Sequence, residues 1–139
     1  MILGYGGIGI QVAKLGKAFG MRVTGVRRNP QDDEHADEVL GLDRFEELLP
    51  LTDYLVLALP DSPQTRDIIN ADILEKLNTS AMIINVGRGT AINEVDLADA
   101  LNNGKIAAAA LDTTKIEPLD TNSSLWTAKN CFISAHDSA

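Results

Sequence analysis

Apolar and polar residues alternate along the chain in blocks that predict strands and helices in turn. Apolar or β-branched runs predict strands at residues 1–3, 22–26, 54–59, 82–86, 106–111 and 131–134. Helical patterns predict helices at 10–19, 45–49 (ended by Pro50), 71–77 and from 94 to the Asn103-Gly104 stop. The acidic stretch 32–38 predicts a solvated surface segment. Strands that alternate with helices predict an α/β fold, a doubly wound parallel sheet with helices on both faces, in one domain spanning residues 1–139.

Two of the predicted helices begin with a capping pattern. Asn70 and Asn93 stand at N-cap positions, where a side-chain oxygen accepts a hydrogen bond from an N–H of the first turn. Asp96 occupies the position from which a capping-box side chain reaches back to the N–H of the cap itself. The pairs with the spacing of a hydrophobic staple are Ile69 with Leu74 and Ile92 with Leu97.

A glycine-rich turn directly follows the first apolar run. In Gly4-Tyr5-Gly6-Gly7-Ile8-Gly9, the strand, the G-x-G-x-x-G spacing and the helix come in the order of Rossmann-type dinucleotide-binding domains. Gly4 permits a tight turn, Gly6 the approach of a pyrophosphate, and Gly9 close packing of helix on strand. The alternative is a sharp turn without a ligand, but the flanks on both sides favour nucleotide binding. Only three residues precede Gly4, which suggests part of a longer protein.

Composition and charge argue against several classes of function. With 20 acidic and 12 basic residues the net charge is −8, which disfavours broad binding to nucleic acid or to a membrane surface. The single cysteine, Cys131, cannot form an internal disulfide, and no apolar stretch is long enough for a membrane helix. We therefore predict a cytoplasmic protein with no nucleic-acid partner, no membrane partner and no metal site.

Three polar residues stand just past the carboxyl ends of different predicted strands: Arg88, Glu117 and His136. In an open parallel sheet these ends share one edge, which is also where the glycine turn lies. Taken singly, each has a simpler explanation: a loop ion pair for Arg88, a turn residue for Glu117, and a frayed terminal residue for His136. Taken together beside a nucleotide-binding turn, they predict an active site.

Over essentially its whole length the chain resembles the nucleotide-binding domain of the D-isomer-specific 2-hydroxyacid dehydrogenases. The glycine turn matches that family, and so does the order Arg, Glu, His along the chain. Three positions depart from it: Ala135 stands where proline is usual, and Asp61-Ser62 stand where Leu-Thr is common. The other matching segments are Leu59-Pro60 with Thr65-Arg66, Asn85-Val86-Gly87-Arg88-Gly89, Ala110-Leu111-Asp112, Glu117-Pro118-Leu119 and Ile133-Ser134-Ala135-His136.

The resemblance implies hydride transfer between a nicotinamide coenzyme and a 2-oxo or 2-hydroxy acid. It implies that Arg88 holds the substrate carboxylate, that His136 exchanges the proton, and that Glu117 orients the imidazole. Asp112 is expected to meet the nicotinamide carboxamide. The family adds a substrate-covering domain from chain on both sides, so we expect this domain to be inactive alone. The family also commonly dimerises through this domain, so a homodimer is one of the oligomeric states that stay open. Coenzyme contacts are implied for Gly4, Gly6, Gly7, Ile8, Gly9, Leu59, Pro60, Thr65, Val86 and Gly87.

The end of the second predicted strand favours NADP(H) over NAD(H). In this fold an acidic residue about 20 residues past the glycines accepts the ribose hydroxyls of NAD. Arg27, 18 residues after Gly9, and Arg28 stand there instead, and two guanidinium groups can clamp a 2′-phosphate. Two alternatives stay open: the arginines pair with the acidic stretch, or a bent loop brings Asp32 or Asp33 to the ribose.

Two other functions compete with the dehydrogenase hypothesis. A dinucleotide-sensing interaction module would bind the coenzyme without catalysis, although all three catalytic positions are filled here. A methyltransferase-like fold would also bind a nucleoside cofactor at a glycine turn. That fold, however, leaves Arg88, Glu117 and His136 without a role.

Overall fold

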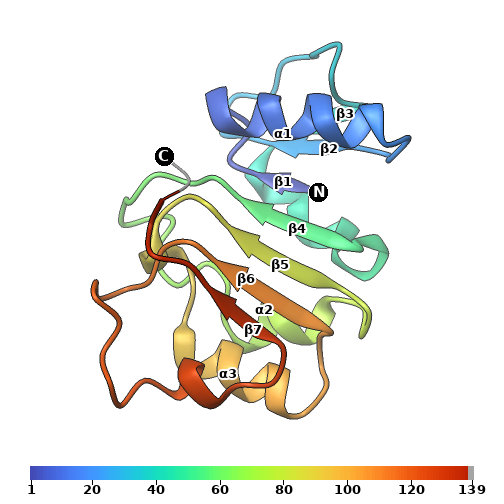
Figure 1. The fold of residues 1–139 in the computed structure, drawn as a ribbon. Helices are drawn as coiled ribbons and strands as arrows, with labels where there is room; N and C mark the ends of the chain where they lie inside the picture. The colour runs from blue at the N-terminus through green and yellow to red at the C-terminus, as the bar shows by residue number, and fades with distance from the viewer. Residues whose placement is uncertain (138–139) are drawn as a thin grey trace.

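In the computed structural model, which describes residues 1–137, seven parallel strands form one sheet (Figure 1). The strand order is β3-β2-β1-β4-β5-β6-β7, so the chain starts near the middle of the sheet and extends it first one way and then the other. The predicted parallel α/β sheet is confirmed. The strands are β1 (Ile2–Leu3), β2 (Thr24–Val26), β3 (Glu38–Leu40), β4 (Tyr54–Leu57), β5 (Met82–Asn85), β6 (Ala108–Leu111) and β7 (Cys131–Ile133).

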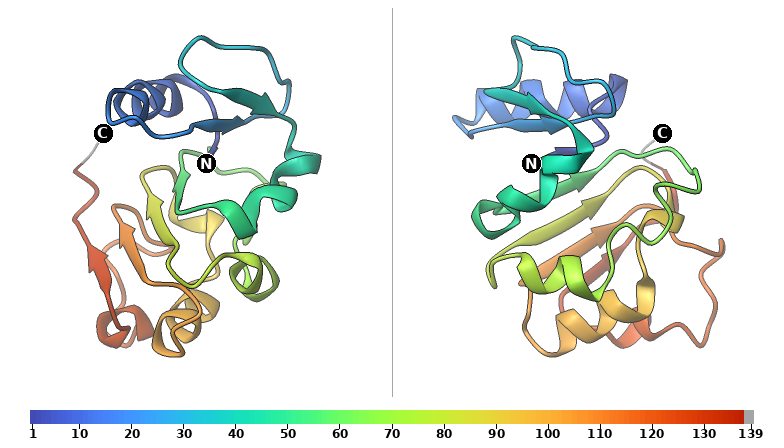
Figure 2. Two further views of the ribbon diagram at one scale, coloured as in Figure 1. Left: turned by 90° about the vertical axis from the view of Figure 1, so that its right-hand side faces the viewer. Right: turned by 180° about the vertical axis from the view of Figure 1, so that it is seen from behind.

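Helices cover both faces of this sheet (Figure 2). One face carries α1 (Gly7–Ala18), which packs beside β1. The other face carries η1 (Leu42–Leu51), a 3-10 helix, together with α2 (Ala71–Lys76) and α3 (Glu94–Asn102), which contact one another in sequence order. Two further 3-10 helices are η2 (Gly89–Ala91) and η3 (Ser124–Thr127). Within residues 1–137, no helix combines the length and the apolar character needed to cross a membrane.

The buried apolar residues form two clusters, one for each face of the sheet. Successive side chains of a strand point to opposite faces. Val56 of β4 therefore joins the smaller cluster beneath α1, which also contains Ile2 and Tyr5. Its neighbours Leu55 and Leu57 belong to the larger cluster beneath η1, α2 and α3. The two clusters fix the sheet between its helices and so hold the carboxyl ends of the strands at one common edge.

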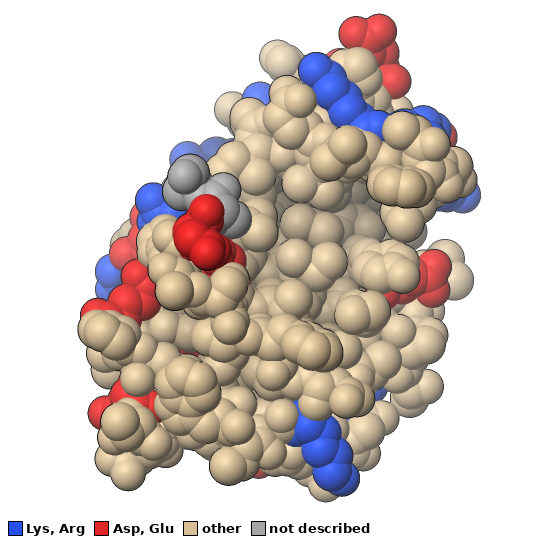
Figure 3. All heavy atoms as spheres, viewed as in Figure 1, with Lys and Arg blue, Asp and Glu red and all other residues tan. Residues whose placement is uncertain are grey.

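Part of the α1 side of the sheet is open. In register, Val56 pairs with Ile84, Ile84 with Ala110, and Ala110 with Phe132 of the edge strand β7. These residues share a face, and Phe132 is 63% exposed on it. Figure 3 shows few charged side chains across this side of the molecule. Beyond Val56, which lies beneath α1, the part of the row from β5 to β7 is thus an uncharged sheet surface that no helix of residues 1–137 covers.

The predicted caps of α2 and α3 are confirmed, but the capping box is not. Asn70 Oδ1 accepts from Ile73 N–H (3.2 Å), and Asn93 Oδ1 accepts from Asp96 N–H (3.2 Å). The Asp96 carboxylate does not reach back to its own cap, because Asn93 N–H already donates to the carbonyl of Ile69. It accepts instead from Ala71 N–H at the start of α2 (3.0 Å), so it joins the two helix starts.

The predicted helix at 45–49 is wrong in length and type. The structure has a ten-residue 3-10 helix, η1, with Pro50 in its last turn instead of after its end. The turn continues past the proline because Thr52 supplies two donors. Its N–H donates to Leu49 O (3.1 Å) and its hydroxyl to Leu48 O (2.8 Å).

The acidic stretch 32–38 is only partly the solvated segment that its charge predicted. The edge strand β3 begins inside it, with Glu38 in register with Thr24 of β2. The carboxylate of Asp37 accepts from the backbone N–H of Val23 (2.7 Å) and from Lys17 Nζ (2.6 Å). An acidic side chain thus serves as the acceptor that binds this edge to β2 and α1, a use that charge alone does not reveal.

Candidate active site

The glycine turn after β1 packs tightly against the end of β4. Gly4 has a φ of 99°, and a Cβ there would lie 2.6 Å from the carbonyl carbon of Ala58. A Cβ at Gly9 would lie 2.7 Å from the carbonyl oxygen of Gly4. Gly6 differs, because a Cβ there would meet nothing within 4 Å. The fold itself therefore requires Gly4 and Gly9, whereas the space beside Gly6 is open to a ligand.

The helix α1 begins at this open space. Gly6 is its N-cap, no side chain caps it, and no acidic side chain lies in its first turn. The N–H groups of that turn therefore have no side-chain acceptor, and they carry the positive end of the helix dipole. Gly7 adds no bulk, and the side chain of Ile8 is 53% exposed. This arrangement fits a pyrophosphate group.

The ends of β4 and β5 form the wall beside the glycine turn. A Cβ at Gly87 would lie 2.7 Å from the backbone N and O of Leu59, so this glycine lets the two loops touch. Thr65 is buried, and its hydroxyl donates to the carbonyl of Pro60 (2.8 Å). Val86 packs against the apolar cluster beneath α1. The structure thus brings the implied coenzyme contacts of β4 and β5 together with those of the turn.

A buried amide holds the loop that carries Arg88. Asn85 has no exposed surface; its Oδ1 accepts from Gly87 N–H (3.0 Å) and its Nδ2 donates to the carbonyl of Arg88 (3.1 Å). The Arg88 guanidinium donates from Nη1 to Gly87 O (2.9 Å), its one hydrogen bond among the described residues. Asn85 is not among the predicted site residues. The feature of the sequence that could have identified Asn85 is a single amide residue at the end of an apolar predicted strand.

Glu117 and His136 form a hydrogen-bonded pair. His136 Nδ1 lies 2.8 Å from Glu117 Oε2, and Glu117 Oε1 accepts from the backbone N–H of Thr114 (3.1 Å). The bond from His136, followed by that from Thr114, holds the pKa of the Glu117 carboxyl below its ordinary value. His136 has a φ of 57°, a conformation that residues other than glycine rarely adopt and that clusters at functional sites.

Arg88, Glu117 and His136 line one pocket of about 180 Å³. The loops that carry them touch, because a Cβ at Gly89 would overlap the backbone of Thr114. All three residues lie past the carboxyl ends of β5, β6 and β7, at the edge that also carries the glycine turn. The expected juxtaposition is therefore present in the structure.

Two further charged residues, absent from the predicted site, line the same pocket. Asp61 accepts from Arg66 Nε (3.1 Å) and from the hydroxyl of Thr90 (2.9 Å), and these bonds lower the pKa of its carboxyl. Lys115 Nζ donates to Asp67 Oδ1 (2.6 Å). Each is paired, so the pocket holds cations and carboxylates in balance. In residues 1–137, no group of three or more histidine, cysteine, aspartate or glutamate side chains is arranged to hold a metal.

Asp112 joins the end of β6 to the loop after β7. It is 6% exposed, and its Oδ1 accepts from the hydroxyl of Ser134 (2.6 Å) and from Asp137 N–H (3.1 Å). With Val86 and Ile84 it lines a cavity of about 290 Å³. Asp112 thus lies directly after β6, the strand between those that lead to Arg88 and to His136.

Within residues 1–137, the two arginines after β2 have no carboxylate partner. Arg27 is half-buried and Arg28 exposed, and neither guanidinium is hydrogen-bonded or ion-paired in the part of the chain that the structure describes. Asp33 accepts instead from Tyr5 Oη (3.0 Å) and from His35 N–H (2.9 Å), and Asp37 pairs with Lys17. The alternative in which the arginines pair with the acidic stretch is therefore not observed.

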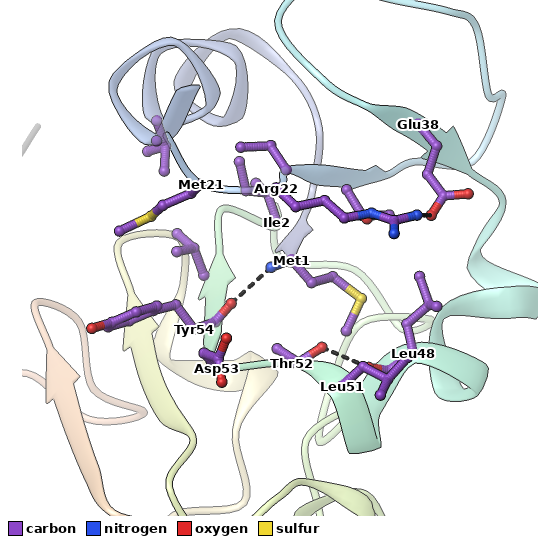
Figure 4. Close-up of a pocket in the computed structure, with 15 residues that line it drawn as sticks. Met1, Ile2, Met21, Arg22, Glu38, Leu48, Leu51, Thr52, Asp53 and Tyr54 are labelled. Atoms are coloured by element: carbon purple, nitrogen blue, oxygen red, sulfur yellow. Dashed lines mark hydrogen bonds and ion pairs between the residues drawn. The ribbon is translucent and has the colours of Figure 1, made fainter. Parts of the chain in front are cut away.

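A separate cavity of about 310 Å³ lies at the opposite edge of the sheet (Figure 4). It is lined by residues at the amino ends of the strands, among them Met1, Arg22 and Tyr54. It contains none of the residues predicted to bind coenzyme or substrate. The candidate active site is therefore assigned to the carboxyl edge.

The sequence of the chain matches a family model and a human protein. A family model described as the NAD binding domain of D-isomer specific 2-hydroxyacid dehydrogenases matches residues 1–138. The chain is 40% identical over 136 residues to a human glyoxylate reductase/hydroxypyruvate reductase, covering 97% of this chain and 42% of that protein.

Two solved structures superpose closely on this chain. A D-isomer specific 2-hydroxyacid dehydrogenase family protein from Aeromonas salmonicida superposes with a TM-score of 0.94 at 41% identity, over 99% of this chain and 44% of that chain. An NADPH-dependent glyoxylate/hydroxypyruvate reductase from Sinorhizobium meliloti, in complex with NADP and sulfate, gives 0.91 at 33% identity, over 99% and 45%. The chain therefore spans less than half the length of these three proteins.

The Glu117–His136 pair makes the stability of the chain depend on pH. Because the pKa of Glu117 is lowered in the folded state, its contribution is complete above the unfolded value of about 4.3 and is lost as pH falls through the folded pKa. We expect Glu117→Gln to lower the free energy of unfolding at pH 7, and the difference from wild type to shrink below about pH 4.3. Urea unfolding of both proteins at a series of pH values measures this difference in the free energy of unfolding.

A matched control is Glu34→Gln, because Glu34 also lies beside a histidine, at 3.6 Å, but its side chain is 87% exposed. This control should follow wild type at every pH. If Glu117→Gln lowered the free energy of unfolding by the same amount at pH 7 and pH 3, the pH dependence assigned to the Glu117–His136 pair would be wrong.

Proposed function

The chain belongs to the D-isomer specific 2-hydroxyacid dehydrogenase family, and on this premise we propose that it is the coenzyme-binding domain of an oxidoreductase that transfers hydride between NAD(P)H and a 2-oxo or 2-hydroxy acid. One observation carries the proposal. A guanidinium and a hydrogen-bonded carboxylate–imidazole pair line one pocket at the sheet edge that also holds the glycine turn. In this proposal a second domain covers the substrate and excludes water.

The residues of the carboxyl edge fit a dinucleotide. The open space at Gly6 and the uncapped start of α1 would receive the pyrophosphate. Leu59, Pro60 and Val86 would line the path toward the pocket, with Asp112 near the nicotinamide carboxamide. The bound coenzyme would supply or accept the hydride. The role of the protein is then to hold, orient and desolvate the reacting groups.

Arg88 would bind the carboxylate of the acid and polarise its carbonyl. Its guanidinium donates one hydrogen bond to Gly87 O, and the other N–H donors of the planar group are left for a ligand. Asn85 fixes the backbone on which this side chain is mounted. A permanently charged group suits this role because it attracts both the bound carboxylate and the charge that develops on the carbonyl oxygen.

His136 would exchange the proton with the substrate oxygen. The bond between Nδ1 and Glu117 fixes the ring and leaves Nε2 for the reacting oxygen. In reduction the imidazolium would donate the proton, and in oxidation the neutral ring would accept it. Glu117, held in turn by Thr114 N–H, would stabilise the charged ring.

A dinucleotide-sensing module without catalysis is the second candidate. The exposed, uncharged row of the sheet that ends at Phe132 favours it, because such a surface suits association with another protein. The filled Arg88, Glu117 and His136 positions favour the enzyme. A measurement of turnover distinguishes these two functions, because the sensing module would have none.

We further propose that the coenzyme is NADP(H). Within residues 1–137 the guanidinium groups of Arg27 and Arg28 have no carboxylate partner, while Asp33 accepts hydrogen bonds from Tyr5 and His35. Two such groups can clamp a 2′-phosphate with charge-assisted bonds. Among similar proteins, the Sinorhizobium meliloti reductase named above is NADPH-dependent, which supports the proposal without deciding it.

Coenzyme binding is tested with Gly6→Val. A Cβ at Gly6 would meet nothing within 4 Å, so the fold should survive, but the branched side chain would fill the space proposed for the pyrophosphate. We expect calorimetric binding of NADPH to be lost while the urea midpoint stays near wild type. Gly9→Val is the contrasting variant, because it meets Gly4 O and should destabilise the fold. A folded Gly6→Val protein that binds NADPH normally would refute the proposed site.

The catalytic role of His136 is tested in a two-domain protein. We would replace the matching 136 residues of the human reductase with this chain and follow reduction of glyoxylate by NADPH. His136→Ala should lower turnover about 10²–10⁴-fold with little change in the Kd for NADPH. The other histidine provides the control: His35→Ala, outside the pocket, should keep the rate. Near-normal turnover of His136→Ala would eliminate the general-acid role.

Coenzyme preference is tested with Arg27→Asp, which reverses the charge where the 2′-phosphate is expected. We expect NADPH to bind at least roughly tenfold more weakly, because a charge-assisted hydrogen bond is lost, and NADH to bind as well or better. The control is Arg22→Asp, in which an arginine at the other end of β2, 79% exposed, changes in the same way. If wild type binds both coenzymes equally and Arg27→Asp leaves their ratio unchanged, the preference is wrong.

A further inference from the structure

Tyr5 occupies an unusual place for a residue of the glycine turn. Its side chain is 1% exposed and packs across β2, where a Cβ at Gly25 would lie 2.5 Å from the ring. Its backbone N–H donates to Val26 O (2.9 Å), so main chain and ring are both fixed against β2. The ring therefore points from the coenzyme turn toward the segment that follows β2.

The hydroxyl of Tyr5 donates to Asp33 Oδ1 (3.0 Å), in the middle of that segment. The same oxygen accepts from His35 N–H (2.9 Å). Burial, followed by the bond to Asp33, raises the pKa of Tyr5 to about 12, and the His35 N–H lowers the pKa of Asp33. The pair therefore keeps its donor and its acceptor throughout the neutral pH range.

This bond connects two parts of the proposed coenzyme site. The segment 27–37 starts with Arg27 and Arg28, and its two ends are tied to the sheet, by Arg27 N–H to Leu40 O (3.0 Å) and by Asp37 N–H to Val23 O (2.8 Å). Between those ends, the bond from Tyr5 to Asp33 is the tie to the glycine turn within residues 1–137. It also engages Oδ1 of the carboxylate that could otherwise turn to the ribose hydroxyls of NAD.

We propose that Tyr5 is a specificity-determining positioning residue, which through Asp33 orders the segment that presents Arg27 and Arg28 to the 2′-phosphate of NADP(H). The proposal rests on the proposed coenzyme function. Without the bond, the segment must be ordered when the coenzyme binds, which weakens binding of the ligand that needs both arginines. NADH makes no phosphate contact there, so it depends less on that order.

The test is Tyr5→Phe, which keeps the ring against Gly25 and removes the donor. Calorimetry with NADPH and with NADH should show the preference for NADPH falling roughly tenfold, the scale of one hydrogen bond to a charged group. The chain has one other tyrosine, and Tyr54→Phe at the opposite edge of the sheet is the control, expected to keep the wild-type ratio. An unchanged ratio, or equal weakening of both coenzymes, would overturn the proposal.

A matched pair at Asp33 separates positioning from charge. Asp33→Asn and Asp33→Ala both remove the negative charge, but only asparagine keeps an acceptor for the Tyr5 hydroxyl. Positioning predicts that Asp33→Ala weakens NADPH binding and that Asp33→Asn does not. Charge repulsion alone predicts tighter NADPH binding in both, and that result would refute the role of Tyr5 even if Tyr5→Phe proved unstable. A wild-type chain that binds neither coenzyme would instead contradict the proposed function.

Discussion

Close backbone contact among the three central strand ends is the constraint on which the site depends. The chain at Ala58 and Leu59 lies against Gly4 on one side and Gly87 on the other, where a single Cβ would force the loops apart. Because β1, β4 and β5 are neighbours, this contact joins the glycine turn and the Arg88 loop into one unit. The two apolar clusters support that unit from both faces.

The acidic chain keeps its site cations available by engaging its carboxylates elsewhere. Asp33, Asp37 and Asp61 each accept hydrogen bonds from other side chains or from the backbone. Arg27 and Arg28 remain without such partners among the described residues, and Arg88 spends one bond on its own loop. A protein with a net charge of −8 thus presents guanidinium groups at the edge where an anionic ligand is expected.

Periodicity and spacing predicted the parallel sheet and the helix caps at Asn70 and Asn93, because these follow from local pattern. They also predicted the convergence of Arg88, Glu117 and His136, which follows from the common direction of parallel strands. The bond between Glu117 and His136 was implied by the family resemblance. Other side-chain bonds between distant segments could not be predicted. Asp96 caps a neighbouring helix, Asp37 serves an edge strand, and Tyr5 reaches Asp33, and in each case the partner is set by packing instead of by sequence distance. The left-handed backbone of His136 likewise has no local signal.

The segment that carries Arg27 and Arg28 lies outside the contact of Gly4, Ala58 and Gly87, in the half of the sheet formed by β2 and β3. Among residues 1–137, the hydrogen bonds that fix Arg88, Glu117 and His136 involve no residue of that segment. An ancestral protein with this architecture could therefore exchange one pool of cellular reducing equivalents for the other through mutations in a single short loop. The groups proposed for acid–base catalysis would keep their geometry through that change, so coenzyme choice and proton transfer would be separable in evolution and in protein engineering.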